Sequence, residues 1–139
     1  MEHTLDDLDR ISDLLNALGN QCEFGCAEAD LESIKQSALQ IKGAKNVRAV
    51  KNWTIWHLDV NESDANVLTK LGFQPQVMYS SNIVFDLHEP YLLGTCVRTT
   101  PLVKFTENCL FETKNTIYIL VDRGTRKTVD PKLAMSIFF

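Results

Sequence analysis

Cysteine and histidine are the residue types in this chain that could bind a metal ion or supply a catalytic nucleophile. Cys22 and Cys26 are separated by three residues, which resembles half of a structural zinc site. Such a site needs a second closely spaced pair of ligands. The remaining candidates are isolated along the sequence: Cys96, Cys109, His57 and His88. The spacing therefore favours four free thiols and predicts no metal and no other cofactor. A thiol enzyme or zinc enzyme whose ligands meet only in space stays open.

A short basic segment near the C-terminus could bind nucleic acid. Arg123, Arg126 and Lys127 fall in a segment expected to be a loop, and aromatic residues precede it. Positive charge beside aromatic rings is the combination that binds single-stranded nucleic acid. The net charge of −4 argues against general nucleic-acid binding, because neutralisation of phosphates drives that binding. A nucleic-acid-binding module is therefore an alternative hypothesis.

The charge is unevenly distributed, and the acidic end could bind a partner. Residues 1–34 contain nine acidic residues and one basic residue, whereas the remainder is net positive. The periodicity of the first 18 residues predicts an amphipathic helix with Asp6, Asp9 and Asp13 on its polar face. This helix either docks on the positive remainder of the fold or offers its acidic face to a basic partner.

A second candidate partner surface lies on a predicted strand. In the segment 53–60, the alternation places Trp53, Ile55 and His57 on one face and Trp56 on the other. The Trp53 face is either covered by a helix or exposed to a partner, and tryptophan is enriched at binding hot spots. The expected partner-binding residues are thus Asp6, Asp9, Asp13, Trp53 and His57.

The elements that would position these residues follow from periodicity and breakers. The fold class is expected to be α+β: two N-terminal helices, a strand–helix–strand unit, then an antiparallel β-meander with a short C-terminal helix. The strand–helix–strand unit is expected to be a right-handed crossover. Residues 1–139 are expected to form one domain, with a soft boundary at 87–94. The expected helices cover residues 1–18, 30–41, 63–71 and 130–137, and the expected strands cover residues 47–50, 53–60, 76–79, 82–86, 96–105, 109–113 and 116–121.

Several segments resemble a family of small uncharacterised bacterial proteins that is known only as a domain of unknown function. The resemblance is best over residues 50–127. It rests on the segments 53–56, 74–75, 94–103, 111–120 and 124–127. The C-terminal part is also similar to short β-meander modules of phage and mobile-element proteins. The resemblance implies a bacterial or phage origin and transfers no activity, cofactor or catalytic residue.

The leading hypothesis is a non-enzymatic protein-interaction module, of the kind found among inhibitors and immunity proteins. The sequence contains no run of about 18 apolar residues, so no membrane-spanning helix is expected. The N-terminus is acidic, unlike that of a signal peptide, so a cytoplasmic location is expected. The expected partner is another protein, with a homodimer as a further option.

Overall fold

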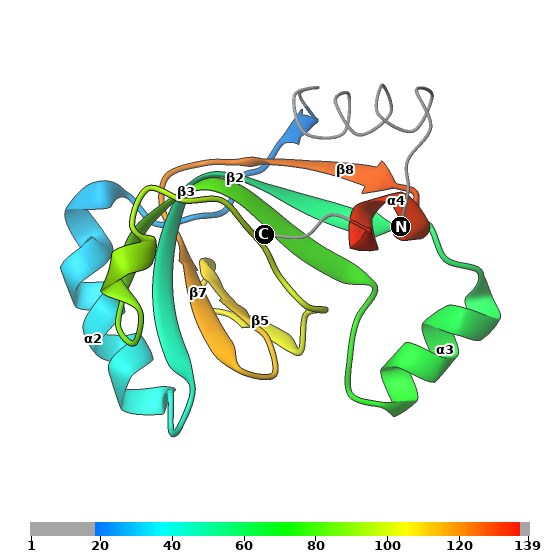
Figure 1. Ribbon diagram of the computed structural model, residues 1–139, viewed down its shortest axis with the longest axis horizontal. Helices are drawn as coiled ribbons and strands as arrows, with labels where there is room; N and C mark the ends of the chain where they lie inside the picture. Colours follow the sequence, from blue (N-terminus) through cyan, green and yellow to red (C-terminus); the bar gives the residue numbers. More distant parts are fainter. Residues whose placement is uncertain (1–18, 137–139) are drawn as a thin grey trace.

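The computed structural model describes residues 19–136, and strands predominate among them (Figure 1). All eight strands belong to one sheet. The helices are α2 (Leu31–Ile41), α3 (Glu62–Lys70) and α4 (Pro131–Met135), and the 3-10 turns are η1 (Glu28–Asp30) and η2 (Pro90–Leu92). The strands are β1 (Asn20–Gln21), β2 (Asn46–Leu58), β3 (Gln76–Asp86), β4 (Val97–Arg98), β5 (Lys104–Thr106), β6 (Leu110–Glu112), β7 (Thr116–Leu120) and β8 (Thr125–Val129).

The long strand β2 organises the sheet, because it pairs with three other strands. Along one edge it pairs antiparallel with β3, with a register shift between Ala49 and Val50. Along the other edge its first half pairs in parallel with β7 and its second half with β8. Asn52, which lies between the two halves, has a positive φ of 51°. The register shift and the positive φ of Asn52 thus lie where the partner strand of β2 changes from β7 to β8.

The sheet is curled, and residues 97–106 connect its β3 side to its β6 side. β4 pairs with β3, and an isolated bridge joins Gln74 to Leu102. Further along the same segment, β5 pairs with β6, which pairs with β7. Pro101 lies between β4 and β5, and proline is found in sheets where a strand is interrupted. The segment 97–106 therefore completes an enclosed interior between β3 and β6.

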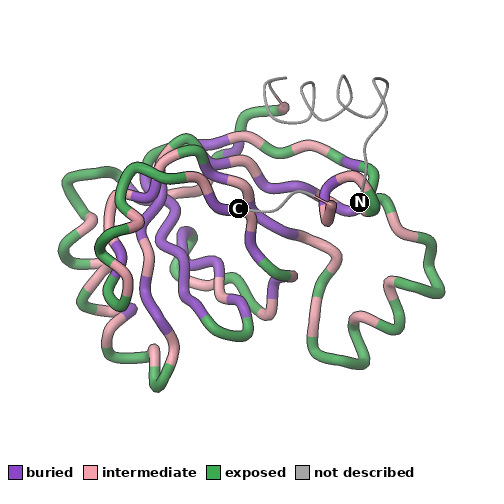
Figure 2. The backbone as a smooth tube through the Cα atoms, in the orientation of Figure 1, coloured by how far each residue is buried: buried purple, intermediate pink, exposed green. Residues whose placement is uncertain are grey.

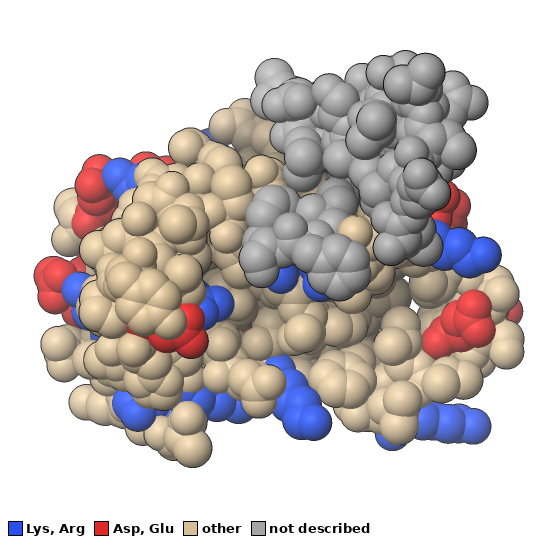
Figure 3. Space-filling view, viewed as in Figure 1, with Lys and Arg blue, Asp and Glu red and all other residues tan. Residues whose placement is uncertain are grey.

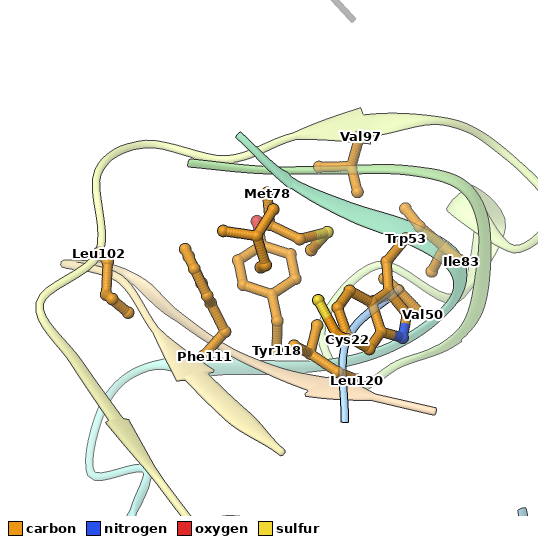
Figure 4. Packing of buried hydrophobic residues seen from close by; sticks show 11 residues of the cluster. Cys22, Val50, Trp53, Met78, Ile83, Val97, Leu102, Phe111, Tyr118 and Leu120 are labelled. Carbon is orange, nitrogen blue, oxygen red and sulfur yellow. The ribbon is translucent and has the colours of Figure 1, made fainter. Parts of the chain in front are cut away.

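Three apolar clusters hold this arrangement together. Figure 2 shows buried positions concentrated along the strands, whereas α3 is mostly exposed and has no buried residue. On the outer face, α2 covers Val47 and Ala49 near the start of β2, and α4 covers Trp56 near its end. The interior cluster is drawn in Figure 4 and consists of Cys22, Val50, Trp53, Ile55, Met78, Ile83, Val97, Leu102, Phe111, Tyr118 and Leu120.

Gly124 allows the turn between β7 and β8 to pass directly over Trp53. A Cβ atom at Gly124 would lie 2.3 Å from the backbone oxygen of Trp53 and 2.4 Å from a ring carbon. The indole Nε1 donates to the backbone oxygen of Val121 at 3.0 Å. The turn and the indole therefore fix one another, and only glycine fits at this position.

The expected fold class is wrong, although several of its elements exist. The expected helices at 30–41, 63–71 and 130–137 correspond to α2, α3 and α4. The helix expected over residues 1–18 lies outside the described residues. β2 and β3 are antiparallel, so α3 belongs to a hairpin connection and not to a crossover. The expected loop at Thr125–Lys127 is part of strand β8, and β7 and β8 both run parallel to β2, which a meander does not allow.

Candidate functional site

A pocket at the end of β2 brings together aromatic, amide and basic side chains. It has a volume of about 380 Å³ and opens at the end of the curled interior where β5 and β8 lie. We refer to it as the aromatic pocket. Its lining residues are Phe24, Ile55, His57, Gln74, Gln76, Leu102, Phe105, Phe111 and Arg126.

The aromatic wall of this pocket is built by packing. Phe24 stacks on Trp53 with ring centroids 5.4 Å apart, and it meets the edge of Phe105 at 5.1 Å. The Trp53 ring is fixed in turn by Gly124 and by its hydrogen bond to Val121. Phe105 lies on β5 and remains 36% exposed. The wall therefore combines a rigid base with one ring that is accessible from outside.

The basic part of the pocket comes from two neighbouring parallel strands. His57 lies on β2 and Arg126 on β8, where the register places Arg126 beside Ile55. Burial lowers the pKa of His57 below its ordinary value, and the positive charge of Arg126 lowers it further. His57 is thus uncharged at neutral pH, and Arg126 supplies the positive charge. Within residues 19–136, no carboxylate forms an ion pair with Arg126.

A second pocket lies toward the start of β2 and contains two arginines. Its volume is about 720 Å³. We refer to it as the arginine pocket. Its lining residues are Arg48, Ile83, Glu89, Leu92, Thr95, Cys96, Val97 and Arg98.

Most of the charge in the arginine pocket is engaged within the protein. Asp86 is 4% exposed and accepts a short hydrogen bond from Nε of Arg48. It also accepts hydrogen bonds from Nδ2 of Asn46 and from the backbone nitrogen of Glu89, both at 2.8 Å. Burial raises the pKa of Asp86, but these hydrogen bonds outweigh burial and hold it below its ordinary value. Arg48 and Asp86 therefore form a structural ion pair that ties β2 to the end of β3.

Arg98 and Cys96 occupy the other side of the arginine pocket. Nη1 of Arg98 donates to the backbone oxygen of Ala134 at 3.3 Å, and its buried Nε has no hydrogen-bond partner among the described residues. The hydroxyl of Tyr79 donates to Sγ of Cys96 at 3.8 Å. Burial, together with Cys96, raises the pKa of Tyr79 to about 12. Tyr79 is consequently a neutral hydrogen-bond donor at physiological pH.

The sequence matches the family described as a domain of unknown function, DUF6957, over residues 23–136. The chain belongs to this family. The match is broader than the resemblance over residues 50–127, and it includes every lining residue of both pockets. No curated protein and no solved structure matches the chain.

Of the expected partner-binding residues, the structure of this family member describes Trp53 and His57. Asp6, Asp9 and Asp13 lie outside the described residues. Trp53 is 1% exposed, so its ring belongs to the interior and offers no surface to a partner. It is covered by the opposite wall of the curled sheet and not by a helix. His57 is half-buried and lines the aromatic pocket.

The expected nucleic-acid-binding residues differ in exposure and in orientation. Arg123 and Arg126 are exposed, whereas Lys127 is half-buried. Arg126 and Lys127 are consecutive on β8, and consecutive side chains of a strand point to opposite faces. Only Arg126 of the three lines the aromatic pocket.

Other pocket residues escaped the sequence analysis. No function was expected for the phenylalanines Phe24, Phe105 and Phe111. The paired glutamines Gln74 and Gln76 gave no signal by residue type. Alternation along residues 74–76 could have placed both glutamines on one face, but not beside His57.

Two further structural findings concern metal binding and membrane-spanning helices. In the part of the chain that the structure describes, no group of three or more His, Cys, Asp or Glu side chains is placed to hold a metal ion. No described helix is long and apolar enough to cross a membrane.

Proposed function

We propose that this family member is a binding protein for another protein, and that its aromatic pocket receives an acidic segment of the partner that also carries an apolar side chain. The observation that carries this proposal is the exposed Arg126, which lines an aromatic pocket and lacks an ion-pair partner within residues 19–136. A guanidinium in this setting can bind a carboxylate through two parallel hydrogen bonds.

The apolar part of the pocket suits an anchoring side chain. Phe105 presents an accessible ring, and Phe24 supports it from behind. The volume of about 380 Å³ is at the small end of the range of roughly 300–1,000 Å³ for ligand pockets. The pocket therefore has room for a short stretch of chain with its anchor. Interface hot spots commonly consist of such aromatic anchors beside an arginine.

The neutral amides and imidazole would fix the orientation of the segment. Gln74 and Gln76 each offer a donor and an acceptor, and neutral His57 offers one of each. Polar groups that a bound ligand would cover reject a ligand that cannot satisfy their hydrogen bonds. We therefore propose specific recognition of one segment, and not general adhesion to acidic proteins.

The proposal includes a reducing, cytosolic location. Its support is that all four cysteines are free, as expected for a protein in a reducing compartment.

The test uses an array of short peptides in which acidic and apolar content vary independently. Peptides with both features should bind. Arg126→Gln should weaken their binding by about tenfold, the factor that about 1.4 kcal/mol represents. The matched control is Arg123→Gln, which removes an exposed positive charge that does not line the pocket. Equal losses in both variants, or binding that ignores acidic content, would refute the proposal.

A single-stranded nucleic acid is the alternative ligand. The observation that favours it is the same combination of a guanidinium with phenylalanine rings. The opposite orientations of Arg126 and Lys127 count against a continuous phosphate-binding groove. This alternative predicts that a labelled single-stranded oligonucleotide binds at low salt and loses affinity steeply as salt rises. Absence of binding at low salt would eliminate it.

A further inference from the structure

Two of the four cysteines lie against each other beneath α2. Cys26 precedes η1, and Cys109 precedes β6. Both belong to the outer apolar cluster that α2 covers, where Cys26 is 8% exposed and Cys109 is 1% exposed. The two thiols are close enough for each to shift the pKa of the other. Two thiols in contact are the starting geometry for a disulfide bond.

The backbone independently places the two residues at adjacent positions. The backbone nitrogen of Cys26 donates to the oxygen of Leu120 at 2.9 Å, and the nitrogen of Leu120 donates to the oxygen of Cys109 at 2.9 Å. The N–H and C=O of one strand residue point to the same edge of the strand. Cys26 and Cys109 therefore follow each other along one edge of β7. A third hydrogen bond, from the nitrogen of Gly25 to the oxygen of Asn108 at 2.9 Å, joins the preceding residues.

We propose that Cys26 and Cys109 are an intramolecular disulfide site, which closes when the protein meets a small-molecule disulfide such as oxidised glutathione. This inference does not rest on the proposed function. It concerns a modification beneath α2, on the opposite side of the sheet from the aromatic pocket.

The reaction takes place in two exchanges. The thiolate of Cys26, the more exposed of the two, attacks one sulfur of oxidised glutathione, forms a mixed disulfide and releases one glutathione thiolate. The thiolate of Cys109 then attacks Sγ of Cys26 and releases the second. The protein loses two protons and two electrons, and one oxidised glutathione becomes two molecules of the thiol.

The burial of both thiols sets the rate of this reaction. Burial raises the pKa of Cys26, and it raises the pKa of Cys109 to about 12. Because only the thiolate attacks, the exchange should be slow at neutral pH and accelerate as the pH rises. Slow closure in a reducing compartment is compatible with free thiols in the resting protein.

The remaining two cysteines are suitable controls. Cys22 packs in the interior cluster, where Figure 4 shows it near Trp53, whereas Cys26 and Cys109 belong to the outer cluster. Cys96 is half-buried beside Tyr79 in the arginine pocket. Neither has another cysteine as a contact among the described residues. Their substitution should therefore leave the bridge intact.

The test incubates the full chain with oxidised glutathione at mildly alkaline pH and counts thiols after denaturation. Two of the four thiols should disappear, and non-reduced peptide mapping should identify a peptide pair joined through Cys26 and Cys109. Cys22→Ser and Cys96→Ser should form the same bridge, whereas Cys109→Ala should accumulate a stable mixed disulfide at Cys26.

The wild-type map decides the proposal even where a buried substitution impairs folding. Retention of all four thiols would overturn it. So would a wild-type map in which Cys26 or Cys109 joins a different cysteine, or in which only Cys96 is modified by glutathione.

Discussion

The two pockets at opposite ends of β2 handle positive charge in opposite ways. In the arginine pocket, Arg48 is paired with the buried Asp86 and also approaches Glu89 at 3.5 Å. In the aromatic pocket, Arg126 has no carboxylate partner within residues 19–136, and the wall beside it is held by ring packing. A paired charge that joins two strands serves the fold. An exposed charge without a partner remains available for a ligand.

The charged surface around the pockets differs from the pockets themselves. Figure 3 shows basic and acidic side chains interspersed over the α2 and α3 ends of the face it presents. Interspersed charges of both signs are the normal state of a soluble surface, and exposed pairs contribute little free energy. The two pockets differ from this background because each gathers its arginines beside a cavity.

The largest expected effect comes from breaking the ion pair at the arginine end. Asp86→Ala should lower the free energy of unfolding by about 3–5 kcal/mol, because it leaves the largely buried Arg48 without its main partner. Chemical denaturation measures this loss. Glu89→Gln is the matched control, because its carboxylate is more exposed and its removal should change stability by about 1 kcal/mol or less. Similar losses in the two variants would contradict a structural role for the buried pair.

The same ion pair predicts how stability changes in acid. The pKa of Asp86 is lower in the folded protein than in the unfolded chain. Its stabilising contribution is therefore complete above the unfolded value of about 3.9 and is lost as the pH falls through the folded value. The stability difference between the wild type and Asp86→Ala should shrink below about pH 4. A difference that stays constant in acid would refute the assignment.

The second effect tests the packing that supports the aromatic end. Gly124→Ala should destabilise the protein by about 1–3 kcal/mol, because the added Cβ would overlap the backbone and ring of Trp53. Gly72→Ala is the control for loss of glycine itself. Gly72, unlike Gly124, has a positive φ, so its substitution costs backbone strain, but an added Cβ would meet no atom within 4 Å. Trp53 fluorescence should change in the first variant alone, and unchanged fluorescence there would contradict the packing argument.

Sequence reasoning recovered the elements of this fold better than their arrangement. The helix that begins after Asp130 with Pro131 was readable, because capping and proline signals are local. Strand β8 was missed because Arg126 and Lys127 suggested a solvated loop, and its parallel pairing with β2 is a long-range contact. Strand β2 was expected as two strands, 47–50 and 53–60, and Asn52, which has a positive φ, lies in the gap between them.

The candidate site shows the same division between local and long-range information. His57 and Arg126 were each selected from the sequence, but for two different functions. Their meeting in one pocket depends on the parallel pairing of β2 with β8, which no local pattern encodes. Phe24 joins them because the segment after β1 passes across Trp53. Residue types therefore identified single members of the site, and topology assembled them.

A smaller effect is expected when the charge at the aromatic end is removed. Arg126→Gln should change the free energy of unfolding by no more than about 0.5 kcal/mol, as for other exposed side chains outside special contacts. Chemical denaturation of this variant beside Asp86→Ala compares the two ends directly. A loss of several kcal/mol in Arg126→Gln would mean that this arginine serves the fold, and the contrast between the pockets would collapse.

The smallest effect is a pH dependence that originates at His57. Its pKa is lowered in the folded protein, first by burial and then by Arg126. The unfolded chain, with a histidine pKa of about 6.5, therefore binds more protons, and stability should decline as the pH falls below that value. His57→Gln should flatten the stability profile below about pH 6.5. In Arg126→Gln, the His57 pKa measured by NMR should move upward. A carboxylate bound beside Arg126 would also raise that pKa, because it favours the charged imidazole. Binding of an acidic segment should then strengthen as the pH falls toward the His57 pKa, whereas a wild-type His57 that titrates at or above the free-histidine value would contradict this account of the pocket.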